Sequence, residues 1–250
     1  TPLNEQDLKT MSEAVEVLRQ FKGFSYFTEM SDIINRLEDH VASARMKTTP
    51  IIDFEKNESL KGLDYLDTIY HAIVNEHPIQ LKYRSFKARS ANSFIFYPYL
   101  LKEYRNRWFV YGVRGNGRIL QNLALDRIQS LEVLPQQHYI KNTFFDPNTF
   151  FDDLVGVTKN SGSVAEKIGF KVAAAEAPYI ITKPIHRSQQ VVERLADGSV
   201  ILEIEVVINH ELERVFFGYA EGIQVLYPKT LVELMGRKLK KAAEQYTHSK

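Results

Sequence analysis

Basic and aromatic side chains are concentrated in one stretch of this 250-residue chain, from Ile79 to Leu134. Ten Lys and Arg residues lie there against three Asp and Glu residues, so the stretch has a net charge of +7. The whole chain has a net charge of only +1, which leaves −6 for the remainder. Arginine presents a planar set of donors that suits phosphate, and aromatic faces stack on nucleobases. The stretch therefore predicts a site for a phosphate-bearing ligand, such as a nucleotide or a single-stranded nucleic acid.

Nine residues of this stretch are candidates for ligand binding, and several of them have a structural alternative. They are Tyr83, Arg84, Tyr99, Arg105, Arg107, Trp108, Tyr111, Arg118 and Arg127. The pattern around Trp108 favours a core position over ligand stacking, and Arg127 can form an ion pair with the adjacent Asp126. Arg105 and Arg107 can be solvated turn residues instead. Tyr83 and Arg84 alternate along a strand, so one faces inward and the other outward, and the pattern does not decide which.

The sequence offers little support for catalysis or metal binding. The chain has no cysteine, which removes thiolate chemistry and cysteine-ligated zinc, and its seven histidines lack the spacing of a metal site. It contains neither a phosphate-binding loop nor a nucleophile elbow. His186 and Ser188 are two members of a catalytic triad without a third, and Glu203 and Glu205 are typical of a solvated strand face. We therefore predict a protein that is not an enzyme and that uses no metal and no cofactor.

Three helices followed by five strands are predicted for the first part of the chain. Apolar residues recur every three or four positions in 8–18, 27–41 and 64–75, which is the spacing of one helix face. The period then changes to two, which predicts strands over 79–84, 94–101, 107–113, 118–124 and 128–134. Pro98 indicates an edge or a bulge in the second of these strands. Five short antiparallel strands with tight turns favour a small β-barrel.

The last part of the chain has a different order of elements. Its order is strand–helix–strand–strand–helix–strand, with Asp197-Gly198 as a hairpin turn and a final helix over 231–246. This order is that of the split ferredoxin-like pattern. We therefore predict an α+β chain of three parts. They are a helical linker and dimerisation segment at 1–62, a ligand-sensing β-barrel domain at 63–160, and a ferredoxin-like βαββαβ domain at 161–250.

Several segments resemble the WYL domain of bacterial transcriptional regulators. The run Arg107-Trp108-Phe109-Val110-Tyr111-Gly112 is similar to the Trp-Tyr-Leu motif that names the family, with Phe109 in place of Tyr and Val110 in place of Leu. Three further segments resemble the first strand, the proline-bearing second strand and the closing Leu-Asp-Arg-Ile element of that domain: 79–84, 97–101 and 123–128. The tail, with Asp197-Gly198 and Val225-Leu226-Tyr227-Pro228, resembles the extension that follows it. The resemblance covers nearly the whole chain.

The resemblance implies an Sm- or SH3-like barrel that senses nucleotides or nucleic acid within a homodimer. Ligand binding would then change the affinity of the dimer for promoter DNA, which requires different ligand affinities in the two states. Regulators of this family usually begin with a winged helix-turn-helix. No such unit is recognisable before the barrel, so we expect promoter DNA to be bound by a head domain missing from this chain.

The remaining expectations concern location and an alternative function. The sequence has no apolar run long enough to span a membrane and begins with polar and acidic residues, and we expect a cytoplasmic protein. The alternative is a protein–protein interaction module built on the same SH3-like barrel, with no nucleic-acid ligand, because a fold alone does not determine function.

Overall fold

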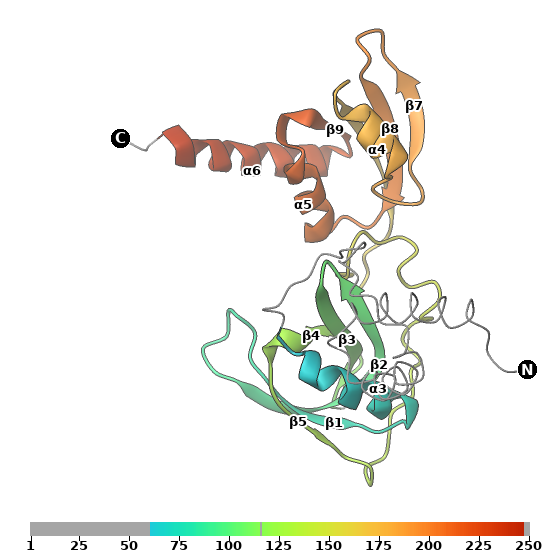
Figure 1. Cartoon of the computed structure of the whole chain (residues 1–250), viewed down its shortest axis with the longest axis vertical. Helices are drawn as coiled ribbons and strands as arrows, with labels where there is room; N and C mark the ends of the chain where they lie inside the picture. The colour runs from blue at the N-terminus through green and yellow to red at the C-terminus, as the bar shows by residue number, and fades with distance from the viewer. Residues whose placement is uncertain (1–60, 116, 248–250) are drawn as a thin grey trace, which may run out of the picture. The chain divides into compact units, whose positions relative to one another are not determined.

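The computed structural model describes residues 61–115 and 117–247, which divide into two compact units between Asn142 and Thr143 (Figure 1). The helices predicted over 8–18 and 27–41 lie outside the described residues. The three-part division at 62/63 and 160/161 stays a prediction. In the part of the chain that is described, no helix is both long enough and apolar enough to cross a membrane.

Unit 1, which ends at Asn142, contains one antiparallel sheet and short helices. Its elements are η2 (Leu63–Tyr65), α3 (Leu66–Val74), β1 (Ile79–Tyr83), β2 (Asn92–Tyr104), β3 (Arg107–Arg114), β4 (Leu120–Ala124), η3 (Leu125–Arg127) and β5 (Ile128–Val133). The strands lie in the order β4-β3-β2-β1-β5. All five predicted strands are therefore confirmed, with ends that differ by a few residues.

The closed barrel is not confirmed. The two edge strands of the sheet, β4 and β5, follow one another in the chain and are joined by η3. No ladder of backbone hydrogen bonds joins β4 to β5 in the described residues. The end of β4 nevertheless reaches the end of β1, because the N–H of Ala124 donates to the hydroxyl of Tyr83 over 3.3 Å. The Sm- or SH3-like form of this sheet stays a prediction.

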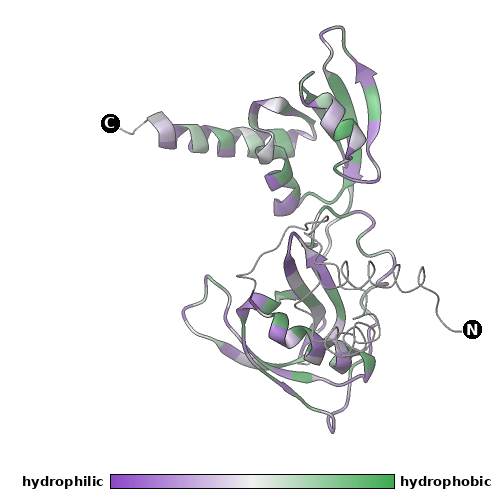
Figure 2. Cartoon of the chain, viewed as in Figure 1, coloured by the Kyte–Doolittle hydropathy of each residue, from purple (hydrophilic) through white to green (hydrophobic). Residues whose placement is uncertain are grey.

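Successive side chains along each strand of unit 1 point to opposite faces of the sheet, so apolar residues at every second position cover one face. Figure 2 shows polar and apolar residues alternating along these strands. Leu81, Phe96 and Val110 are completely buried on one face, together with Ile69 from α3. Burying each such side chain stabilises the fold by about 1.5–3 kcal/mol. The register shifts beside Pro98, so the proline marks a bulge. Strand β2 lies between β1 and β3 in the sheet, but its pairing with β1 ends at Phe96, so Pro98 is paired with β3 alone.

Unit 2 begins at Thr143 and contains the second sheet. Its elements are β6 (Glu166–Val172), α4 (Ala177–Thr182), β7 (Gln190–Arg194), β8 (Val200–Val206), α5 (His210–Gly218), η4 (Ala220–Gly222), β9 (Ile223–Tyr227) and α6 (Lys229–Thr247). The antiparallel strands lie in the order β7-β8-β6-β9. The predicted alternation of strands and helices is confirmed, whereas the ferredoxin-like layout stays a prediction.

The core of unit 2 lies between one face of its sheet and its three helices. Ile168, Phe170 and Val172 alternate along β6 and are completely buried. Ile180 of α4, Phe216 of α5 and Leu231 of α6 belong to the same buried cluster, so all three helices cover the same face. The hairpin expected at Asp197-Gly198 is present, and Gly198 adopts the left-handed φ of 82° that such a turn requires.

Candidate functional site

An open pocket of about 280 Å³ lies in unit 1, where the end of β1 meets η3. Seven residues line it: Arg84, Ser85, Phe86, Asp126, Arg127, Ile128 and Gln129. Strand β1 pairs with β5, and the register shifts between Lys82 and Tyr83. Just beyond this shift, the N–H of Arg84 donates to the carbonyl oxygen of Arg127 over 3.1 Å. This pairing brings two predicted ligand-binding arginines to the same pocket, although they are far apart in the sequence.

The carboxylate of Asp126 lies between two arginines of the candidate set. Its Oδ2 is 3.1 Å from Nε of Arg107, whereas its Oδ1 is 3.8 Å from Nε of Arg127. Oδ1 of Asp126 and Nε of Arg127 are both buried and have no hydrogen-bond partner among the described residues. Asp126 is therefore bound closely by Arg107 and only loosely by Arg127. The alternative predicted for Arg127, an ion pair with Asp126, is present, but it leaves hydrogen-bonding capacity of this guanidinium unused.

Phe86 provides the aromatic surface of the pocket. Its side chain is 72% exposed, which is unusual for phenylalanine. The Cζ atom of Arg127 lies 4.6 Å from the centre of the Phe86 ring, a distance typical of a cation–π contact. The sequence analysis did not select Phe86, because one aromatic residue in a loop has no periodicity. Its position between Arg84 and Lys87 is the signal that could have indicated it.

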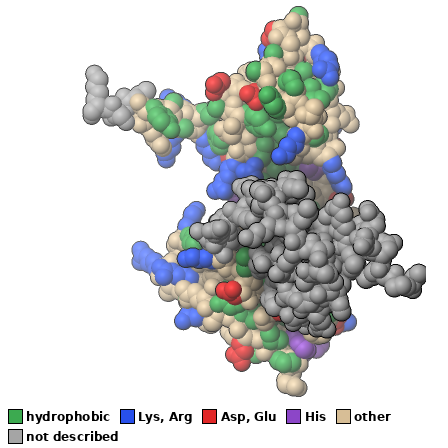
Figure 3. Space-filling model, in the orientation of Figure 1, with side chains coloured by type: hydrophobic (Ala, Val, Ile, Leu, Met, Phe, Trp, Pro, Cys, Tyr) green, Lys and Arg blue, Asp and Glu red, His purple; other side chains and the backbone are tan. Residues whose placement is uncertain are grey.

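The β1–β2 loop adds positive charge beside the pocket. Arg84, Lys87 and Arg89 are all exposed, and none has an ion-pair partner among the described residues. Figure 3 shows Lys and Arg side chains on the side of unit 1 where this loop runs. Unpaired cations that gather at an open pocket raise the local concentration of anions.

The structure also settles how Tyr83 and Arg84 alternate. Tyr83 is the inward residue, only 9% exposed, and Arg84 is the outward one. Burial raises the pKa of the Tyr83 hydroxyl above its usual value, and the positive charge of Arg127 partly opposes this. Tyr83 thus belongs to the buried core, whereas Arg84 lines the pocket.

Three predicted arginines do not line the pocket, and one of them, Arg107, reaches it only through its contact with Asp126. Arg105 occupies the β2–β3 turn with a φ of 50°, and its guanidinium lies 5.5 Å from the ring centre of Tyr104. Arg118 is exposed in the β3–β4 loop, beyond the end of β3 that is opposite Arg107. A strand of this length spans about 23 Å. The structure therefore brings together Arg84, Arg107 and Arg127, and places Arg118 elsewhere.

Comparison with protein families gives two matches. Residues 64–133 match the WYL domain, and residues 165–243 match the WCX domain. The chain therefore contains a WYL domain followed by a WCX domain. The pocket, η3 and all nine predicted ligand-binding residues lie within the matched WYL domain.

Solved structures and curated proteins were also compared. The chain is similar to the proteasome accessory factor B/C (PafBC) of Arthrobacter aurescens, with 14% identity over 84% of this chain and a TM-score of 0.30. It is also similar to a crystal structure described as a CRISPR Cas-related protein, with 12% identity over 74% of this chain and a TM-score of 0.44. The chain spans 30% and 52% of the lengths of these two proteins. No curated protein matches it significantly.

The remaining predicted aromatic residues of the WYL domain do not line the pocket. Trp108 is half-buried and packs against the core, which supports its structural alternative. Tyr111 is 2% exposed and Tyr99 is 8% exposed. Burial raises the pKa of Tyr99 to about 12, and its ring contacts that of Tyr139 at 6.1 Å between centres. A direct role for these three residues in ligand binding stays a prediction.

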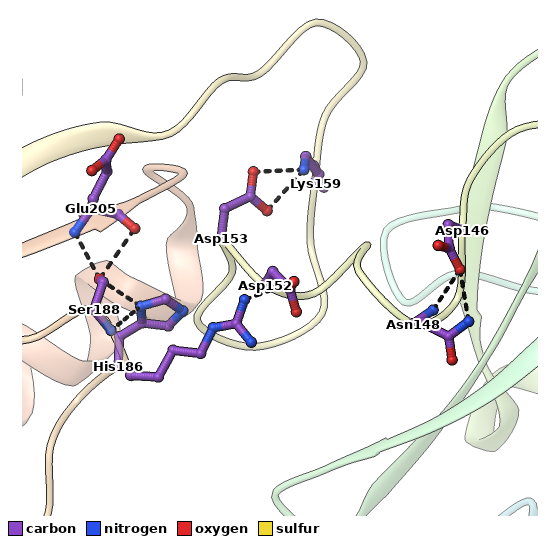
Figure 4. A network of polar contacts seen from close by, with 9 residues as sticks. Asp146, Asn148, Asp152, Asp153, Lys159, His186, Ser188 and Glu205 are labelled. Atoms are coloured by element: carbon purple, nitrogen blue, oxygen red, sulfur yellow. Dashed lines mark hydrogen bonds and ion pairs between the residues drawn. The ribbon is translucent and has the colours of Figure 1, made fainter.

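In the WCX domain, His186 and Ser188 form a structural contact (Figure 4). The Ser188 hydroxyl lies 2.7 Å from Nδ1 of His186, and the backbone N–H of Ser188 donates to the same nitrogen. The backbone N–H of Glu205 donates to the Ser188 hydroxyl over 2.9 Å. Because Glu205 contributes its backbone and not its carboxylate, this arrangement is not a triad. These hydrogen bonds attach the segment that precedes β7 to strand β8. The family match likewise points to regulation rather than catalysis.

Proposed function

We propose that this chain is the ligand-sensing region of a WYL-family transcriptional regulator and binds a nucleotide or single-stranded nucleic acid. The observation that carries this proposal is the convergence of Arg84, Arg127 and the exposed Phe86 on one open pocket. The two guanidinium groups can donate to phosphate oxygens, and the Phe86 ring can stack on a base.

The same site offers a route by which a ligand could regulate a protein. A ligand shifts an equilibrium only when it binds two conformations with different affinity. Asp126 and Arg127 belong to the short η3 turn, whose backbone is in close contact with Gly62. A ligand that draws Arg127 toward the pocket opening therefore acts on η3 and on the chain at Gly62. In the parent regulator, this change would alter promoter binding by a winged-helix head in a homodimer.

Binding of a labelled oligothymidine, measured by fluorescence anisotropy across a salt series, tests the proposal. The logarithm of the binding constant should fall linearly with the logarithm of the salt concentration. Arg84→Ala and Arg127→Ala should each weaken binding about tenfold or more, because a hydrogen bond to a charged group contributes about 1.5–3 kcal/mol. Arg194→Ala is the matched control, since Arg194 is exposed on β7 in the other unit and its loss changes the net charge equally.

Two outcomes would overturn the proposal. One is the absence of binding to nucleotides and oligonucleotides at low salt. The other is unchanged binding when Arg84 and Arg127 are both replaced. Either result would favour the alternative, a protein–protein interaction module without a nucleic-acid ligand. Arg84 is exposed, so Arg84→Ala is expected to fold normally and to keep the test decisive. Sedimentation at micromolar concentration tests the homodimer separately, and a monomer there would contradict it.

A further inference from the structure

The charges around the pocket do not balance. Arg84 and Arg127 line the pocket together with a single carboxylate, that of Asp126, which Arg107 contacts from outside the lining, so these four side chains have a net charge of +2. Asp126 is only 12% exposed and its closer contact is with Arg107. The excess charge therefore resides on Arg84 and Arg127, which face the pocket opening. A ligand that matches this site should bring about two negative charges to one place.

Phosphate monoesters and diesters differ in this property. A monoester has a charge of about −1.5 to −2 near pH 7 and three terminal oxygens that accept hydrogen bonds. An internal phosphodiester of a strand carries a single charge. Arg84 and Arg127 lie side by side through the 3.1 Å bond between their backbones, so both can donate to the same phosphate.

The size of the pocket and the position of Phe86 also favour the end of a strand. A volume of about 280 Å³ is at the small end of the range for ligand pockets, which suits one nucleotide better than several. A base inside a strand has a neighbour on each face, and separating stacked bases costs a few kcal/mol. A terminal base already has one open face that the exposed Phe86 ring can cover.

We propose that this pocket recognises a terminal phosphate monoester, on a nucleotide or at the end of a single strand, in preference to an internal phosphodiester. The inference rests on the proposed function and adds the chemical class of the ligand. It assigns the two negative charges of the monoester to Arg84 and Arg127, and the terminal base to Phe86.

Oligothymidine strands of about eight nucleotides, identical except for their ends, test this selectivity with the full chain. One strand has a 5′-phosphate, one has a 3′-phosphate and one has hydroxyl groups at both ends. We expect at least one phosphorylated strand to bind about tenfold more tightly than the hydroxyl strand at pH 7.5. The preference should decrease at pH 5.5, because the second pKa of a phosphate monoester is about 6.

Variants connect the preference to the pocket. Arg84→Gln should reduce the ratio between phosphorylated and hydroxyl strands, whereas the control Arg194→Gln should leave the ratio unchanged. Equal binding of all three strands, lost in Arg127→Ala, would overturn this inference and leave the proposed function standing. No binding of any strand would overturn both. A preference for a phosphorylated end that survives in both Arg84→Gln and Arg127→Ala would place the selectivity at another site and would also refute the inference.

Discussion

Gly62 and the backbone of η3 are in such close contact that a single methyl group should disturb the pocket. Gly62 has a φ of +87°, which lies in the left-handed region. A Cβ atom on this residue would lie 2.4 Å from the carbonyl carbon of Leu125 and 2.7 Å from the nitrogen of Asp126. Both are backbone atoms, so no side-chain rotation can relieve the overlap. Gly62→Ala must therefore displace either η3 or the segment that begins at Gly62.

Two contributions set the size of the effect. A left-handed backbone costs an L-residue about 1–2 kcal/mol, and overpacking typically costs about 1–3 kcal/mol. Gly62→Ala should therefore lower the free energy of unfolding of the WYL domain by about 2–5 kcal/mol. The chain has a single tryptophan, Trp108, so urea unfolding followed by its fluorescence reports on this domain alone. With a urea dependence of about 2 kcal/mol per M, the midpoint should fall by about 1–2.5 M.

Gly115→Ala separates the two contributions. Gly115 also has a positive φ, of +53°, but a Cβ atom there would meet nothing within 4 Å. This variant should lose only the conformational part, about 1–2 kcal/mol. If both variants lost the same stability within about 0.5 kcal/mol, the close contact between Gly62 and η3 would be refuted as the cause.

Three further predictions concern the two domains. Phe86→Ala should weaken oligonucleotide binding by about 1–3 kcal/mol. Because the residue is 72% exposed, the free energy of unfolding measured by Trp108 fluorescence in urea should change by no more than about 0.5 kcal/mol. An equal loss in both assays would contradict its role in the pocket. Burial holds the pKa of His186 below its usual value, so the folded WCX domain takes up this proton less readily than the unfolded chain. Its stability should fall as the pH drops below about 6.5, and urea unfolding followed by circular dichroism at pH 7 and pH 5 should show a smaller difference in His186→Asn. In the native domain, Oδ1 of Asn209 accepts a hydrogen bond from the N–H of Leu212, and its side-chain amide donates to the carbonyl oxygens of Val155 and Thr158. Asn209→Ala removes these bonds and should lower the free energy of unfolding by about 2–4 kcal/mol in the same assay, whereas Asn209→Ser, which keeps a capping oxygen, should recover about 1 kcal/mol.

Local patterns predicted the elements of both domains because these patterns are set by residues close in the sequence. Strands with alternating burial, such as β1 and β8, show a clear period of two. Asp197-Gly198 and the bulge at Pro98 follow from backbone conformations that few residues allow. The ends were less accurate: the strand predicted over 94–101 extends from Asn92 to Tyr104 as β2, because its backbone pairing with β1 and β3 continues beyond the apolar residues.

The membership of the site could not be predicted in this way, because it depends on which strands pair. The sequence does not distinguish Arg84 from Arg118 as ligand-binding candidates, because both lie in the basic stretch at one end of a predicted strand. The pairing of β1 with β5 brings Arg84 to Arg127, whereas Arg118 lies beyond the far end of β3. Phe86 has no periodic neighbours, so only the fold indicates that its exposed ring lies against Arg127.

Arg107 can contribute to the proposed site without lining the pocket. Its Nε lies 3.1 Å from Asp126, and this contact occupies the carboxylate oxygen that it faces. Without it, the buried Asp126 would need another cation, and Arg127 is the nearest one, already 3.8 Å away. A closer Asp126–Arg127 pair would neutralise the guanidinium on which the proposed phosphate binding depends. The charge of Arg107 thus keeps Arg127 available, and the excess of arginines over carboxylates matters as much as the position of any one of them.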